Sequence, residues 1–133
     1  MLKTFLAVKQ FRRSGQQHVG CYPTFPPNKV QTQALALIKE EVDELEAAIE
    51  DQDLVEIADA LCDIVFTTLG AAVAYGLPMA LMMDEVVRTN MLKVSNGVVK
   101  DALGKICKPE GWEPPKLRTI INLARGERNR PPI

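Results

Sequence analysis

Residues 60–75 read ALCDIVFTTLGAAVAY, and this stretch decides the fold. It predicts a helix with apolar side chains on every face. The interruptions are Asp63, Thr67, Thr68 and Gly70. A helix that is apolar all round must be covered all round. A membrane span is the competing interpretation, but the run falls short of the roughly 18 residues that a span needs, and it contains a charge. We therefore expect a core helix and no membrane partner.

The size of the chain limits how this helix can be covered. A chain of 133 residues forms one small domain, residues 1–133, which can hardly wrap such a helix completely. We therefore expect a homo-oligomer, a dimer or a tetramer built as a dimer of dimers, with a core shared between subunits. A stable, folded monomer at micromolar concentration in a sedimentation experiment would contradict this expectation.

The remaining pattern is also helical. Apolar residues recur every three or four positions, and turn residues separate the runs. Asn28 is a candidate N-cap, and Gly76 is a candidate helix end. The predicted helices cover about 4–13, 30–50, 54–75, 78–94 and 116–124. The fold class is all-α: an antiparallel helix bundle with a helical core at about 28–95, a C-terminal extended arm or hairpin at about 96–116, and a mobile tail from residue 126.

Composition excludes several classes of function. Lysine and arginine total 16 against 17 acidic residues, no polybasic run is present and aromatic residues make up 5%, so we expect no nucleic-acid partner. The three cysteines are odd in number and widely spaced, which excludes a full disulfide framework and a zinc knuckle. The first residues lack the pattern of a signal peptide. We expect a cytoplasmic protein.

Acidic residues recur in pairs on two neighbouring predicted helices. Glu41 and Glu44 are three positions apart, as are Glu56 and Asp59, so each pair shares a helix face. If the chain reverses near residue 50, an antiparallel hairpin places one pair opposite the other. Four carboxylates would then converge.

Such convergence needs a counter-charge. Two unit charges about 5.5 Å apart repel by roughly 3 kcal/mol at an effective dielectric constant near 20. No lysine or arginine lies between Lys39 and Arg88. A divalent cation would balance the carboxylates, and oxygen ligands favour Mg²⁺, for which Mn²⁺ can substitute. Mg²⁺ in turn binds substrate phosphates. Two structural alternatives stay open: a solvated helix face, and Glu56 as the partner of Asp53 in a capping box.

These residues carry a resemblance to a known family. Glu40-Glu41-x-x-Glu44 followed by Glu56-x-x-Asp59 resembles the signature of MazG-like all-α nucleoside triphosphate pyrophosphohydrolases. The superfamily includes dimeric dUTPases and phosphoribosyl-ATP pyrophosphohydrolases. The similarity continues through EIADALCDIVFTTLGAA, GLP, VVRTNMLK and GKICKPEGWEPPKL, and covers roughly residues 25–117. The small size is similar to that of phage-borne members, for which the location would be the host cytoplasm.

The resemblance implies roles for individual residues. Glu41, Glu44, Glu56 and Asp59 would bind the metal, and Glu40 or Glu44 would accept a proton from the attacking water. The residues implied to contact the substrate are Asn90, Lys93 and Lys108. Trp112 is either a lid or an anchor of the arm. Ala34 departs from the family pattern, since many relatives have an arginine there; basic residues near the termini, such as Arg128, are candidates to replace it.

The implied activity is Mg²⁺-dependent hydrolysis of a nucleoside triphosphate, ribose or deoxyribose, to the monophosphate and pyrophosphate. Resemblance to the MazZ subgroup favours dGTP or GTP. The alternatives are a substrate of the dUTPase or dCTPase kind, and phosphoribosyl-ATP, which the arm and the proline-rich loop disfavour. A di-iron bundle needs Glu-x-x-His pairs, whereas the only histidine, His18, lies in a loop. A non-catalytic helical oligomer is the alternative from another class.

Overall fold

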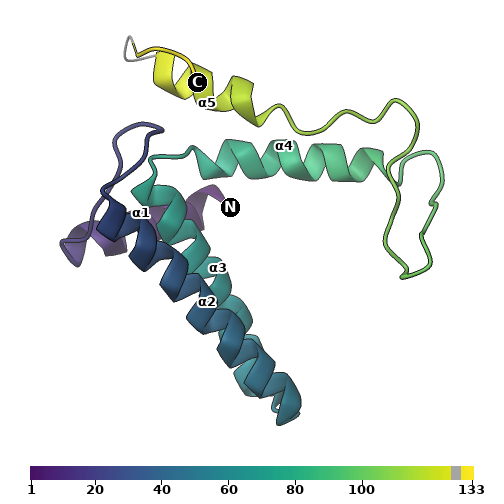
Figure 1. Cartoon of the computed structure of the whole chain (residues 1–133), viewed down its shortest axis with the longest axis horizontal. Helices are drawn as coiled ribbons and strands as arrows, with labels where there is room; N and C mark the ends of the chain where they lie inside the picture. The colour runs from purple at the N-terminus through teal and green to yellow at the C-terminus, as the bar shows by residue number, and fades with distance from the viewer. Residues whose placement is uncertain (127–129) are drawn as a thin grey trace. The chain divides into compact units, whose positions relative to one another are not determined.

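The regular secondary structure of the chain is helical throughout its described part (Figure 1). This computed structural model describes residues 1–126 and 130–133, and within them five helices and no β-strand occur. The helices are α1 (Leu2–Ser14), α2 (Asn28–Glu50), α3 (Leu54–Ala74), α4 (Met79–Leu92) and α5 (Leu117–Gly126). The predicted all-α fold class is confirmed. The chain forms two compact units, Met1–Met79 and Ala80–Ile133.

Helices α2 and α3 form the antiparallel hairpin of the first unit and pack along each other (Figure 1). The turn between them centres on Gln52, which has a left-handed φ of 54°. Asp53 is the N-cap of α3, because its carboxylate accepts hydrogen bonds from the amides of Val55 (2.9 Å) and Glu56 (3.1 Å). The Asp53 amide donates to the Ala48 carbonyl instead of to Glu56. The Glu56 side chain is therefore not committed to closing a capping box.

The C-terminal end of α3 has the hydrogen bonds of a Schellman motif. The Gly76 amide donates to the Val73 carbonyl at 3.1 Å, and the Leu77 amide donates to the Ala72 carbonyl at 3.0 Å. Gly76 has a φ of 67°, a conformation that side chains with a Cβ rarely adopt. The prediction that α3 ends at this glycine is confirmed.

The loop between α1 and α2 is held against this end of α3. The Gly20 amide donates to the Val73 carbonyl at 2.9 Å, and the Thr24 amide donates to the Tyr75 carbonyl at 3.0 Å. A Cβ on Gly20 would lie 2.5 Å from the backbone nitrogen of Gly76, so the two backbones touch. Next to this contact in the sequence of α3, Leu69 and Val73 form a buried cluster with Val8 of α1. The loop and α1 therefore cap one end of the hairpin.

Much of α3 remains exposed in the single chain. Leu54 is 78% exposed and Val55 75%, and Leu61 and Val65 are each about half exposed. At 21 residues α3 is long and apolar enough to cross a membrane by length and composition alone, a test that core helices of soluble proteins also pass. The length argument made on residues 60–75 therefore does not hold for the whole helix. The absence of a membrane partner stays a prediction.

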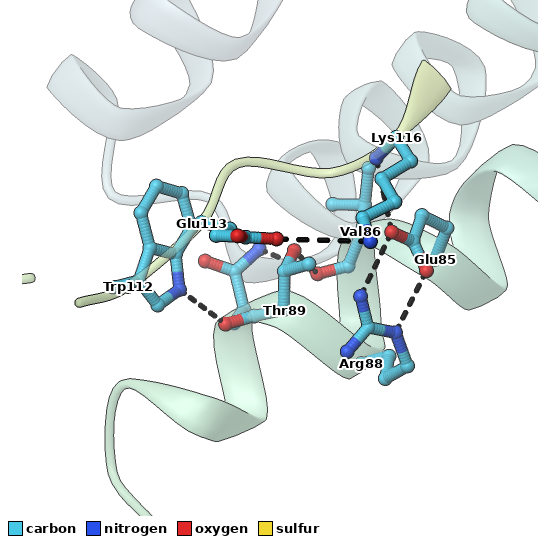
Figure 2. Close-up of polar contacts among 8 residues, drawn as sticks. Glu85, Val86, Arg88, Thr89, Trp112, Glu113 and Lys116 are labelled. Atoms are coloured by element: carbon cyan, nitrogen blue, oxygen red, sulfur yellow. Dashed lines mark hydrogen bonds and ion pairs between the residues drawn. The ribbon is translucent and has the colours of Figure 1, made fainter. Parts of the chain in front are cut away.

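In the second unit, the segment after α4 is held against α4 by a carboxylate and an indole (Figure 2). Glu85 accepts two hydrogen bonds from the Arg88 guanidinium, at 2.7 and 2.9 Å, and one from the Lys116 amide at 2.9 Å. The indole nitrogen of Trp112 donates to the carbonyl of Thr89 at 2.7 Å. These bonds join both ends of the Trp112–Lys116 segment to one face of α4.

Several sequence-based boundaries need correction. Pro27 occupies the N-cap position of α2, and Asn28 is the first helical residue without a capping bond. The arm begins after Leu92, and its hairpin is limited to an isolated bridge between Lys100 and Ile106. The end of the tail is bound to α5, since the Ile133 amide donates to the Asn122 side chain at 2.8 Å. Arg128 lies outside the described residues.

The hydrogen bonds to Glu85 make the attachment of the arm dependent on pH. The bonds from Arg88 and Lys116 lower the pKa of Glu85 from 4.5 to about 2. The folded state therefore binds fewer protons than the unfolded state between these values. Stability from Glu85 is present above pH 4.5 and is lost as the pH falls towards 2. Proteolysis of the arm by pepsin should accelerate across this window.

The matched variants are Glu85→Gln and Glu113→Gln. Glu85→Gln should raise arm cleavage already at pH 5 and flatten its pH dependence, because the charge is absent at every pH. Glu113 is exposed, with its carboxylate 3.7 Å from Lys116, so Glu113→Gln should keep the wild-type profile. Equal profiles for Glu85→Gln and the wild type would contradict this account.

Candidate functional site

The predicted site residues fall into two sets. The acidic residues lie on the α2–α3 hairpin in the first unit, and the polar and basic residues lie on or after α4 in the second. The first set is Glu40, Glu41, Glu44, Glu56 and Asp59; the second is Asn90, Lys93 and Lys108.

Glu41 is the most perturbed member of the acidic set. Its side chain is half-buried, and its Oε2 atom is buried without a hydrogen-bond partner. Burial raises the pKa of Glu41 above its usual value, and repulsion from Glu44, Asp63, Glu40 and Asp59 raises it further. A buried carboxylate oxygen without a donor is costly unless a cation or proton reaches it. Glu41 is therefore the position on the hairpin where a bound cation would lower the free energy most.

The pairing across the hairpin differs from the predicted one. Asp63 affects Glu41 more than Asp59, the residue predicted to lie opposite it, does. The reason is the position of the turn: it centres on Gln52, two residues later than assumed, so each residue of α2 faces a later residue of α3. Asp63 was left without a role by the sequence. Its spacing of four from Asp59 places both on one face of α3 and was the available signal.

The acidic side chains do not form a finished metal site as they stand. Within residues 1–126 and 130–133, no three acidic, histidine or cysteine side chains are grouped closely enough to hold one ion. Glu44, Glu56 and Asp59 are exposed, as expected when like charges avoid each other without a counter-charge. The set of four metal ligands stays a prediction. The chemistry of the cluster, oxygen ligands with excess negative charge, fits a hard divalent cation.

The second set is organised around the indole of Trp112. The ammonium group of Lys93 lies 4.8 Å from the ring centroid, and that of Lys108 lies 4.9 Å from it. The Asn90 side chain accepts a hydrogen bond from Lys93 at 2.7 Å and donates one to the Val86 carbonyl at 2.9 Å. Asn90, predicted to contact substrate, therefore also orients Lys93.

A cavity of about 380 Å³ lies beside Trp112, within the second unit. Its lining residues include Arg88, Asn96 and Lys116. The sequence did not single out Glu85, which holds this wall together, or Thr89, which is 1% exposed and accepts the indole hydrogen bond. The spacing Glu85-x-x-Arg88 on a predicted helix was a signal for the first; nothing local indicated the second.

One known protein family matches this chain. The model of the family phosphoribosyl-ATP pyrophosphohydrolase matches residues 8–90, which is more than half of the chain. The chain belongs to the phosphoribosyl-ATP pyrophosphohydrolase family. A search of curated proteins found no match. The family and the MazG-like enzymes belong to the same all-α superfamily, so this part of the resemblance is confirmed, while the MazZ subgroup stays a prediction.

Membership of the phosphoribosyl-ATP pyrophosphohydrolase family identifies the chain as a hydrolase with nucleotide pyrophosphohydrolase activity in general. The matched residues include the whole acidic set and end at Asn90. Lys93, Lys108 and Trp112 lie beyond the match, so their roles depend on the geometry around the indole.

Proposed function

We propose that this chain hydrolyses the phosphoanhydride bond between the α- and β-phosphates of a nucleoside triphosphate, releasing pyrophosphate. The observation that carries the proposal is Glu41, whose half-buried carboxylate lacks a donor and lies among Glu44, Asp59 and Asp63. This excess of negative charge, with no lysine or arginine between Lys39 and Arg88 in the sequence, supports binding of Mg²⁺ or Mn²⁺.

The proposed roles are those that the resemblance implies, and exposure and charge support them. Glu41, Glu44, Glu56 and Asp59 would hold the cation, and the geometry adds Asp63 as a neighbour of Glu41. The cation supplies charge neutralisation for the phosphates and activates water. Glu40 and Glu44 are exposed and can accept the proton of the attacking water. Lys93 and Lys108 supply positive charge for the phosphate chain.

Two candidate substrates have separate support. The resemblance to phage members favours a ribo- or deoxyribonucleoside triphosphate, with dGTP or GTP first. The family match supports the second candidate, phosphoribosyl-ATP, which loses pyrophosphate from the same kind of bond. The match thereby strengthens an alternative that the arm and the proline-rich loop had disfavoured.

One assay separates the candidates. The purified chain is incubated with Mg²⁺ and each of the eight common NTPs and dNTPs, and with phosphoribosyl-ATP, and pyrophosphate and orthophosphate are measured. We expect pyrophosphate, no orthophosphate, and no turnover after chelation of the metal. Turnover of phosphoribosyl-ATP alone would select the second candidate, and no pyrophosphate from any substrate would contradict the proposal.

We also propose that the functional form is a cytoplasmic homo-oligomer. The support is the apolar surface of the hairpin, where Leu35, Val42 and Val65 are each about half exposed. Burial between subunits would complete the cover that α3 lacks in one chain. Sedimentation velocity at micromolar concentration should show a dimer or a tetramer, and a folded monomer would contradict this.

A further inference from the structure

Trp112 occupies an unusual position among the charged groups of the second unit. Its ring has the ammonium groups of Lys93 and Lys108 within 5 Å of its centroid, at 4.8 and 4.9 Å. Cations are attracted to the negative face of an indole, the best of the aromatic rings for this purpose. One side chain therefore gathers two positive charges, one from the end of α4 and one from the arm.

The other cations near this ring are neutralised, and these two are not. Arg88 is paired with Glu85, and Lys116 lies 3.7 Å from Glu113 (Figure 2). Within the described part of the chain, neither Lys93 nor Lys108 forms an ion pair with a carboxylate. Two ammonium groups that repel each other and lack a counter-ion form an arrangement that an anion would stabilise.

The ring itself is fixed in place. The indole N–H donates to the carbonyl of Thr89, a residue that is 1% exposed, at 2.7 Å. The side chain of Asn90, the residue after Thr89, accepts a hydrogen bond from Lys93 at 2.7 Å. The Lys93 ammonium is thus held between an amide oxygen and a ring, while among the described residues the Lys108 ammonium has the ring as its partner. The arrangement reduces the rotamer freedom that a lysine loses on binding a ligand.

We propose that Trp112 is a positioning residue that holds Lys93 and Lys108 as a pair, and that this pair binds the phosphate chain of a nucleotide. The inference deepens the proposed function and rests on it for the identity of the anion. Each nitrogen lies within 5 Å of the same ring centroid, at 4.8 and 4.9 Å, so one phosphate chain would contact both lysines. Trp112 acts through the lysines and does not itself need to touch the substrate.

The probe that tests the pair is inorganic tripolyphosphate, added without divalent metal at low ionic strength. Trp112 is the only tryptophan of the chain, so its fluorescence reports directly on this site. We expect a saturable change in emission for the wild type. Lys93→Gln and Lys108→Gln should each raise the dissociation constant about tenfold, since each removes one charge-assisted contact. Lys100→Gln, on the same arm, is the matched control and should bind as the wild type does.

Two variants separate positioning from simple anchoring of the arm, with binding measured by calorimetry. Trp112→Phe keeps an aromatic face but loses the hydrogen bond to Thr89, and Trp112→Leu keeps only apolar bulk. We expect Trp112→Phe to bind within about threefold of the wild type and Trp112→Leu about tenfold more weakly. With nucleotide, Trp112→Leu should raise KM and leave kcat within about threefold. Equal weakening in both variants would assign Trp112 to anchoring and overturn the proposal, as would wild-type affinity in Trp112→Leu.

The outcomes separate this inference from the proposed function. Lysine-dependent binding of tripolyphosphate without pyrophosphate release from any nucleotide would leave the lysine pair standing and remove the enzymatic proposal. Normal pyrophosphate release with unchanged KM in Lys93→Gln, Lys108→Gln and Trp112→Leu would remove the pair and leave the enzyme.

Discussion

Alanine in place of Glu44 or of Asp59 is expected to lower pyrophosphate release by about 1,000-fold, because a bound cation supplies several kcal/mol of charge stabilisation and each 1.4 kcal/mol is tenfold in rate. Both side chains are exposed and contribute to the repulsion on Glu41. Neither makes a described hydrogen bond that the fold needs. The helical circular dichroism signal should therefore persist in both variants.

A thermal measurement distinguishes this loss from a structural defect. Removal of one carboxylate reduces repulsion, so without divalent ions the variants should melt at or above the temperature of the wild type. Added Mg²⁺ should raise the melting temperature of the wild type and have little effect on either variant. Glu46→Ala, on an exposed position of the same helix, is the control and should retain both activity and the response to Mg²⁺. Activity retained in both Glu44→Ala and Asp59→Ala would remove the proposed cation site.

Gly76→Ala is expected to destabilise the first unit by about 3 kcal/mol or more, with a fall of over ~10 °C in melting temperature. Two penalties combine: the φ of 67° disfavours any Cβ, and the added Cβ would overlap the backbone carbonyl of Tyr22. Gly20→Ala meets the other side of this contact, 2.5 Å from the Gly76 nitrogen and 2.7 Å from the Ala74 oxygen. It should be destabilising for steric reasons alone.

The matched control is Gly15→Ala in the same loop. Gly15 has a φ of −80°, and a Cβ there would meet its nearest neighbour, the Phe11 carbonyl oxygen, at 3.4 Å. Its effect on the free energy of unfolding should stay within about 0.5 kcal/mol. Thermal or urea unfolding followed by circular dichroism measures all three variants. A melting temperature of Gly76→Ala equal to that of Gly15→Ala would show that the loop does not pack on α3 in this way.

Features determined by local sequence were predicted well. The apolar period, the break at residues 51–53 and Gly76 each act within a few residues, and the hairpin that they predict is present. Helix boundaries differed from the predicted ones by a few residues. At α2, for example, Pro27 and not Asn28 occupies the N-cap position. The unit boundary between Met79 and Ala80 depends on packing density and had no local signal.

The candidate site was predicted in kind but not in detail. Four carboxylates on two helices identified the cluster, yet their pairing depends on where the turn centres. Because the turn lies two residues later than assumed, Asp63 acts on Glu41 more strongly than Asp59, its predicted neighbour, does. Lys93 and Lys108 both lie near the ring of Trp112, although fifteen positions of mostly irregular chain separate them in the sequence. No periodic pattern encodes such a contact, so sequence alone left the role of Trp112 undecided.

The contact between Gly20 and the end of α3 also bears on the order of folding. The α2–α3 hairpin closes across a turn of three residues, whereas Gly20 and Val73 are joined only after more than fifty intervening residues have been brought into place. Loop-closure entropy therefore favours the hairpin as the nucleus and the N-terminal segment as the last part to dock. The same segment would be the first to detach, exposing the C-terminal end of α3 while the acidic hairpin remains formed.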